Sequence, residues 1–90
     1  MKKEKLRERI MCIPPKRDIT FEELDLFLRN NGFILKRNAQ SAHPMYAHNK
    51  YKELTAEFAK PHGNTNEVRP TYIKNIQRVI EQLEDKEKEP

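Results

Sequence analysis

Hydrophobic residues recur every three or four positions in three parts of the chain, which predicts three amphipathic helices. The first is short and covers residues 2–13, where leucine and isoleucine are separated by charged residues, and two consecutive prolines end it. This helix either docks on the rest of the domain or frays. The last runs from Pro70 to about Leu83, where six apolar residues form a continuous stripe.

The second helix has the clearest local signal in the sequence. Thr20 is followed three positions later by Glu23, which is the pattern of a capping box at the start of a helix. Gly32 can take the left-handed conformation that ends a helix. Residues 21–31 are therefore predicted to be helical.

Between the second and the last helix the spacing of apolar residues changes to the alternation typical of strands. Residues 33–38, 43–48 and 53–59 are each predicted to be a strand. In the third of them the apolar side chains share one face and the polar side chains share the other. The apolar face holds Leu54, Ala56 and Phe58.

The short connections favour an α+β fold with the order α-β-β-β-α, preceded by the accessory helix. The strands would form an antiparallel sheet, with both main helices on one face and the other face open. Three parts are expected: a basic helix and Pro-Pro linker in residues 1–15, a folded domain in residues 16–83, and a charged, solvated or frayed tail in residues 84–90.

Composition limits the class of protein. Ninety residues with 36% hydrophobic content allow one domain with a modest core. No apolar run approaches the roughly 18 residues of a membrane span, so we expect a soluble cytoplasmic protein without membrane contact. Cys12 is the only cysteine, which argues against a disulfide or a zinc knuckle. Residues 1–17 hold seven Lys or Arg against two Glu, which exceeds the net charge of +4 of the whole chain, so overall charge is weak evidence for nucleic acid.

Histidines are the residues best suited to chemistry. His43 and His48 are five positions apart in a predicted strand, so their side chains fall on opposite faces, and no carboxylate cluster accompanies them. We therefore expect no metal site and no cofactor. Imidazole without a metal can cleave RNA, because the substrate supplies its own nucleophile, the 2′-hydroxyl, and the protein need only move a proton and stabilise charge on the phosphate.

Neighbouring side chains could complete such a site. The candidates for holding the phosphate are Lys36, Arg37, Lys50 and Lys52. Tyr46 could stack on a base or donate a hydrogen bond. Each residue also has an ordinary interpretation: the histidine as a half-exposed residue at a strand edge, the lysines as a solvated strand end and the tyrosine as a packing residue.

Four motifs occur in this order: the capped helix, "NGFILKR", "QSAHPMYAH" and, after a His-containing loop, "VRPTYIKNIQRVI". Together, over roughly residues 14–83, they resemble the HicA toxins of bacterial type II toxin–antitoxin systems, also labelled YcfA-like. The resemblance implies a fold similar to the double-stranded-RNA-binding domain, an endonuclease activity on mRNA, and neutralisation by a HicB-type antitoxin.

The resemblance also implies a catalytic residue. The family's active histidine follows a Gly-Ser motif at the start of the second strand, and the equivalent residue here is His43, with Ser41 beside it as an RNA contact. His62, in the loop that follows the third strand, is a further RNA-contacting candidate, although a histidine before glycine is commonly a turn residue. Gln40 stands where the family motif has glycine.

Three hypotheses remain open from the sequence. The first is a metal-independent endoribonuclease with His43 as general acid or base. The second is a noncatalytic RNA-binding or antitoxin-binding module that has the same fold. The third is a small partner-binding protein that uses the basic N-terminal helix.

Overall fold

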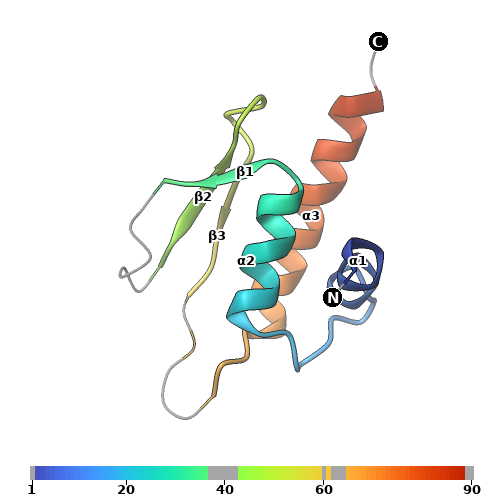
Figure 1. Ribbon diagram of the computed structural model, residues 1–90, viewed down its shortest axis with the longest axis vertical. Helices are drawn as coiled ribbons and strands as arrows, with labels where there is room; N and C mark the ends of the chain where they lie inside the picture. Colours follow the sequence, from blue (N-terminus) through green and yellow to red (C-terminus); the bar gives the residue numbers. More distant parts are fainter. Residues whose placement is uncertain (1, 37–42, 60, 62–64, 89–90) are drawn as a thin grey trace.

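The computed structural model describes residues 2–36, 43–59, 61 and 65–88 (Figure 1). These residues form three helices and three strands: α1 (Lys3–Ile10), α2 (Phe21–Asn30), β1 (Phe33–Leu35), β2 (Met45–His48), β3 (Thr55–Glu57) and α3 (Pro70–Lys88). The predicted α+β order and the accessory helix are confirmed. Each strand is shorter than predicted.

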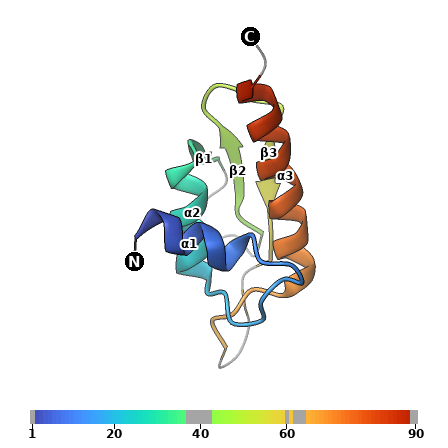
Figure 2. The same cartoon turned by 90° about the vertical axis from the view of Figure 1, so that its right-hand side faces the viewer.

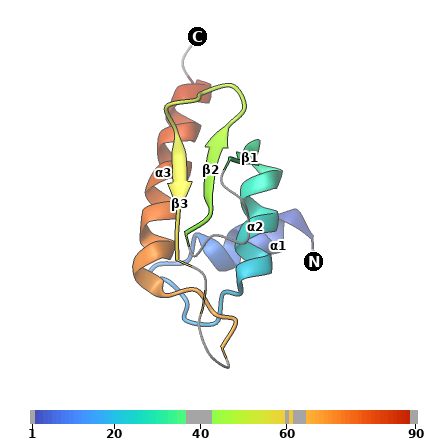
Figure 3. The same cartoon turned by 90° about the vertical axis from the view of Figure 1, so that its left-hand side faces the viewer.

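The strands form an antiparallel sheet in the order β1-β2-β3, with β2 in the centre. Helices α2 and α3 cover one face of this sheet, and α1 lies across them on the side away from the sheet (Figures 2 and 3). The molecule therefore has three layers, and the far face of the sheet is left without a helix.

Alternation in the strands decides which side chains enter the core. Leu54, Ala56 and Phe58 are buried, whereas Thr55 and Glu57 between them are exposed, so the predicted apolar face of the third strand is confirmed. Because side chains that are paired across the sheet lie on the same face, the remaining inward positions follow from the register. Tyr46, for example, is paired with Ala56 and is also buried.

Both ends of α2 form as predicted. The Thr20 hydroxyl oxygen accepts a hydrogen bond from the Glu23 N–H at 3.2 Å, and the Glu23 carboxylate accepts one from the Thr20 N–H at 3.1 Å. This is the reciprocal pattern of a capping box. At the other end Gly32 has a φ of 87°, which turns the chain into β1.

Helix α1 docks rather than frays. Leu6 and Ile10 are buried in the common core. The buried side-chain amide of Gln77, on α3, donates to the carbonyl oxygens of Ile10 and Cys12, at 2.8 Å in each case. These carbonyls lie at and beyond the end of α1, where no further helical turn can satisfy them.

Ion pairs fix the orientation of α1. The Arg9 guanidinium pairs with the Glu23 carboxylate at 2.7 Å, so the capping box of α2 is also tied to α1. Arg7 pairs with Glu84 on α3 at 3.0 Å. Helix α1 is therefore attached to both main helices.

The charged segment predicted to be solvated or frayed is helical over its described residues. Helix α3 continues to Lys88, beyond the predicted end near Leu83. Its last turns make contacts that the sequence pattern did not indicate: Glu84 pairs with Arg7, and Lys86 pairs with Glu53 at 2.9 Å. Among the described residues, no helix is long and apolar enough to cross a membrane.

Candidate functional site

His43, two residues before the start of β2, lies in a surface hollow of about 370 Å³. The hollow lies between the start of β2 and the segment that leads into α3, and its described lining residues are His43, Ala59, Pro61, Thr65, Glu67, Arg69 and Tyr72. Small-molecule sites in proteins range from roughly 300 to 1,000 Å³. The hollow is therefore at the small end of that range and suits a ligand about as large as one nucleotide.

The sheet explains why there is space beside His43. Met45 is paired with Glu57, so the same register extended outward by two residues sets Ala59 opposite His43. The alanine side chain is a single methyl group. His43 is exposed, whereas Pro44, the next residue, is buried.

The segment before α3 is held by a short antiparallel pairing with the residues before α2. The Val68 N–H donates to the Ile19 carbonyl at 2.8 Å, and the Phe21 N–H donates to the Asn66 carbonyl at 3.0 Å. Val68 is buried, at 2% exposed. Because successive side chains of an extended segment alternate in direction, the residues on either side of Val68 both point outward. These residues are Glu67 and Arg69, and both line the hollow.

Arg69 is the residue immediately before α3. Its carbonyl accepts hydrogen bonds from the N–H groups of Tyr72, at 3.0 Å, and Ile73, at 3.3 Å, where the helix begins. Throughout the described ranges, no ion pair or hydrogen bond involves the Arg69 guanidinium, and the first turn of α3 contains no acidic residue. The guanidinium therefore adds a full charge to the partial positive charge of a helix N-terminus, a combination suited to an anion.

Two further side chains shape the hollow. Thr65 accepts a hydrogen bond from the Glu67 N–H through its hydroxyl oxygen at 3.1 Å, which fixes the backbone that carries the Glu67 carboxylate. Tyr72, in the first turn of α3, is partly buried and packs against the core. Its ring contributes an aromatic surface to the lining.

Of the predicted phosphate ligands that the structure describes, Lys36 is the one beside the start of β2. Its N–H donates to the Met45 carbonyl at 2.7 Å, so it sits beside the start of β2, and it is exposed. Three other predicted contacts, Arg37, Ser41 and His62, lie outside the described residues.

Lys50 and Lys52 do not belong with His43. They lie in the β2–β3 turn, at the other end of β2 (Figure 3). The whole of β2 (Met45–His48) lies between His43 and Lys50. The Lys50 ammonium instead lies 5.2 Å from the centre of the Tyr51 ring. The structure therefore does not bring these two lysines into the hollow that holds His43.

Tyr46 is a core residue and cannot stack on a base. It is 1% exposed, and its ring stacks on Phe58 with 5.8 Å between ring centres. Its hydroxyl donates to the Asp25 carboxylate at 2.5 Å. Burial and then this hydrogen bond raise the pKa of Tyr46 well above its ordinary value. The packing interpretation of this tyrosine is the correct one.

His48 has a structural role in the β2–β3 turn. It is 7% exposed, and its Nδ1 accepts hydrogen bonds from the N–H groups of Lys50 and Tyr51, both at 3.1 Å. Its ring meets Phe33 edge to face at 5.2 Å. His43 and His48 thus face different environments, and no cluster of three His, Cys, Asp or Glu side chains suited to a metal occurs in the described part of the chain.

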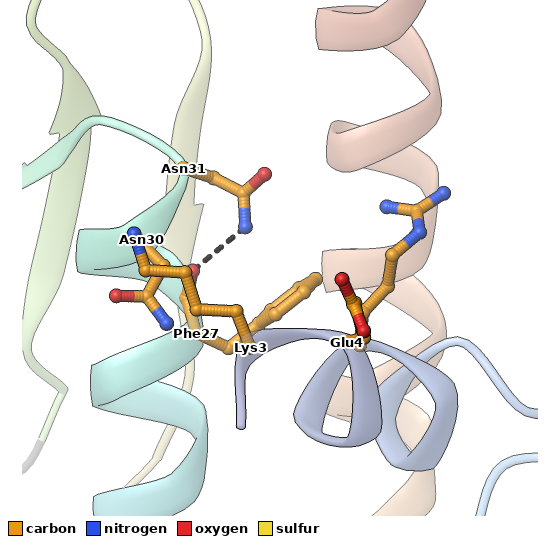
Figure 4. Close-up of a pocket in the computed structure, with 6 residues that line it drawn as sticks. Lys3, Glu4, Phe27, Asn30 and Asn31 are labelled. Carbon is orange, nitrogen blue, oxygen red and sulfur yellow. Dashed lines mark hydrogen bonds between the residues drawn. The ribbon is translucent and has the colours of Figure 1, made fainter. Parts of the chain in front are cut away.

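A second hollow, of about 190 Å³, lies between the start of α1 and the end of α2 (Figure 4). Its wall includes the side-chain amide of Asn31, which donates to the Phe27 carbonyl at 2.8 Å and so completes the end of α2. Its Arg7 is already paired with Glu84. This hollow holds opposite charges and no histidine, so the His43 hollow is the better candidate for chemistry.

Comparison of the chain with protein-family models, with curated proteins and with solved structures finds no match.

Sequence reasoning missed Thr65, Glu67 and Arg69. The available signal was short: one apolar residue, Val68, between two charged residues, followed directly by Pro70 at a helix start. That pattern is typical of a strand-like entry into a helix, with two charges on one side.

Proposed function

We propose that the protein is a metal-independent endoribonuclease of the HicA type, with a fold like the double-stranded-RNA-binding domain, and that a HicB-type antitoxin neutralises it. The observation that carries the proposal is the shared hollow, in which His43 lies with Arg69 and the N-terminus of α3. An imidazole and an anion-binding group are the two components that cleavage of an RNA phosphodiester requires.

In this mechanism His43 acts as the general base. It removes the proton of the ribose 2′-hydroxyl, whose oxygen then attacks the adjacent phosphorus. The bond from phosphorus to the 5′-oxygen of the next nucleotide breaks, that oxygen takes up a proton, and a 2′,3′-cyclic phosphate remains. Arg69 and the positive end of α3 stabilise the negative charge that develops on the phosphate. Imidazole suits the first step because it ordinarily titrates near neutral pH.

Architecture supports the same proposal. The α-β-β-β-α order, with both main helices on one sheet face, is compatible with a fold of the double-stranded-RNA-binding type. Since α1 lies on the helical side, it leaves the open face of the sheet uncovered and accessible to RNA (Figure 2).

The test is cleavage of a long single-stranded mRNA by the purified protein in excess EDTA. We expect fragments from the wild type and a loss of rate of at least about 100-fold in His43→Ala, the scale expected for a general base. Lys52→Ala is the matched control, because Lys52 is exposed at the far end of the sheet and should leave the rate unchanged. Thermal melts must show that all three proteins are folded.

Equal cleavage by His43→Ala and the wild type would disprove the role of His43. Intact RNA in every sample, together with salt-sensitive RNA binding, would instead favour the noncatalytic binding module.

A further inference from the structure

The proposed reaction uses only part of the hollow. His43 and Arg69 serve the phosphate and its ribose, whereas Glu67 and Tyr72 have no role in proton transfer or charge stabilisation. Both line the same hollow. They are therefore available to the part of a nucleotide that remains, which is the base.

Glu67 presents hydrogen-bond acceptors at a fixed place. Its backbone is paired with Thr20 in an isolated β-bridge and is held by the Thr65 hydroxyl. Glu67 and Arg69 point to the same side of the segment, two residues or about 7 Å apart along the chain. An acceptor for the base and a cation for the phosphate are thus presented side by side.

Tyr72 supplies the surface on which a base can lie. Its position in the first turn of α3 and its packing against the core hold the ring in place. A base stacks on an aromatic ring irrespective of its identity, and each such contact strengthens binding measurably. Tyr72 therefore supplies affinity for the base without selecting it.

Selection must come from the carboxylate. An ionised carboxylate only accepts hydrogen bonds, so it prefers a base edge with two adjacent donors. Guanine offers such an edge, the ring N1–H beside the exocyclic amino group. The other three bases place an acceptor beside their donor, which would repel one carboxylate oxygen.

We propose that Glu67 and Tyr72 form a guanine-binding subsite, so that the protein cleaves RNA directly after guanosine. The inference rests on the proposed function, since Arg69 is taken to hold the phosphate that follows the selected base. It assigns base specificity to residues that the motif around His43 does not include.

Binding of nucleoside 3′-monophosphates tests the subsite without relying on catalysis. We expect the wild type to bind 3′-GMP about tenfold more tightly than 3′-AMP, 3′-CMP or 3′-UMP in isothermal titration, the discrimination typical of a bidentate contact to a base. Glu67→Gln should lose most of this preference. Glu81→Gln, an exposed carboxylate on α3, is the matched control and should retain it. Tyr72→Leu should weaken the binding of all four nucleotides, whereas Tyr72→Phe should not.

Cleavage of an RNA of mixed sequence gives a separate readout. Fragments that end in guanosine would support the inference, and cuts after all four bases would overturn it while leaving the nuclease intact. Selective 3′-GMP binding with no RNA cleavage would overturn the nuclease and leave the guanine subsite. Two outcomes would also reject the subsite. One is equal binding of all four nucleotides by the wild type. The other is a cleavage rate of Glu67→Gln that falls by the same factor after each of the four bases.

Discussion

Gly32 lies directly against the imidazole of His48. A Cβ atom placed on Gly32 would come within 2.9 Å of Nε2 of that ring, closer than real Cβ contacts. The Gly32 carbonyl also accepts the Asn49 N–H at 2.9 Å. The end of α2 and the end of β2 therefore meet at a point that has no room for a side chain.

Replacing Gly32 by alanine should destabilise the protein by about 2 kcal/mol, because the residue has a positive φ and the added methyl group would strike the ring. Urea unfolding followed by circular dichroism measures this loss. In a His48→Ala background the added cost of Gly32→Ala should be smaller, because only the backbone strain remains. An equal loss of unfolding free energy in both backgrounds would show that the contact with His48 does not contribute to the effect of Gly32→Ala.

Replacing Gln77 by leucine should loosen α1. The substitution removes the donors to the carbonyls of Ile10 and Cys12, and we expect a loss of about 2 kcal/mol, within the range for leaving buried polar groups unsatisfied. Amide hydrogen exchange should accelerate in α1 more than in β2. Gln82→Leu, at an exposed position of the same helix, should change neither quantity. Unchanged exchange in α1 would contradict the bridging role of Gln77.

The Arg9–Glu23 pair should make part of the stability depend on acid pH. Burial alone would raise the pKa of the Glu23 carboxyl, but hydrogen bonds from Arg9 and the Thr20 backbone lower it below its ordinary value of 4.5. A carboxyl whose pKa is lower in the folded state stabilises the fold fully above its unfolded pKa, and this contribution is lost as the pH falls through the folded value.

The measurement is the free energy of unfolding of the wild type and Glu23→Gln between pH 7 and pH 3. The variant should be less stable at pH 7 by about 1 kcal/mol. The difference should shrink below about pH 4.5 as the wild-type carboxyl takes up its proton. A difference that stays constant down to pH 3 would disagree with the lowered pKa of Glu23.

Replacing Arg69 should make the fold more stable and remove the activity. A cation before a helix is unfavourable to the helix dipole, whereas asparagine is a preferred N-cap residue. Arg69→Asn should therefore raise the free energy of unfolding by about 1 kcal/mol and abolish RNA cleavage. Arg78→Asn, in the exposed middle of α3, should lower stability slightly because asparagine is a poorer helix former, and should leave cleavage unchanged. A less stable but active Arg69→Asn would oppose the proposed phosphate contact.

Helices were predictable from the sequence because their signals are local. The Thr20 and Glu23 capping box lies within four residues, and the apolar spacing of α3 is regular. The end of α3 was missed because its last turns depend on distant partners, such as Glu53 for Lys86. The strand ends were overestimated, because alternation continues beyond the residues that form the sheet.

The site was only partly predictable, for a geometric reason. The motif around His43 indicated one side chain but not which others would surround it. Lys50 is close to His43 in the sequence yet lies at the opposite end of a strand, whereas Arg69 is distant in the sequence and lines the same hollow. The pairing of residues 19–21 with residues 66–68 brings Arg69 there, and single-sequence alternation does not reveal a pairing partner.

The docking of α1 also constrains the order in which the chain folds. The hydrogen bond from Gln77 to Ile10 spans 67 positions, and the contact between Arg7 and Glu84 spans 77. A ribosome makes the N-terminus first. The contacts of α1 with α3 can therefore form only after residues up to Glu84 have emerged, whereas the ion pair between Arg9 and Glu23 on α2 can form much earlier. The attachment of α1 is thus completed in two stages, first to α2 and later to α3.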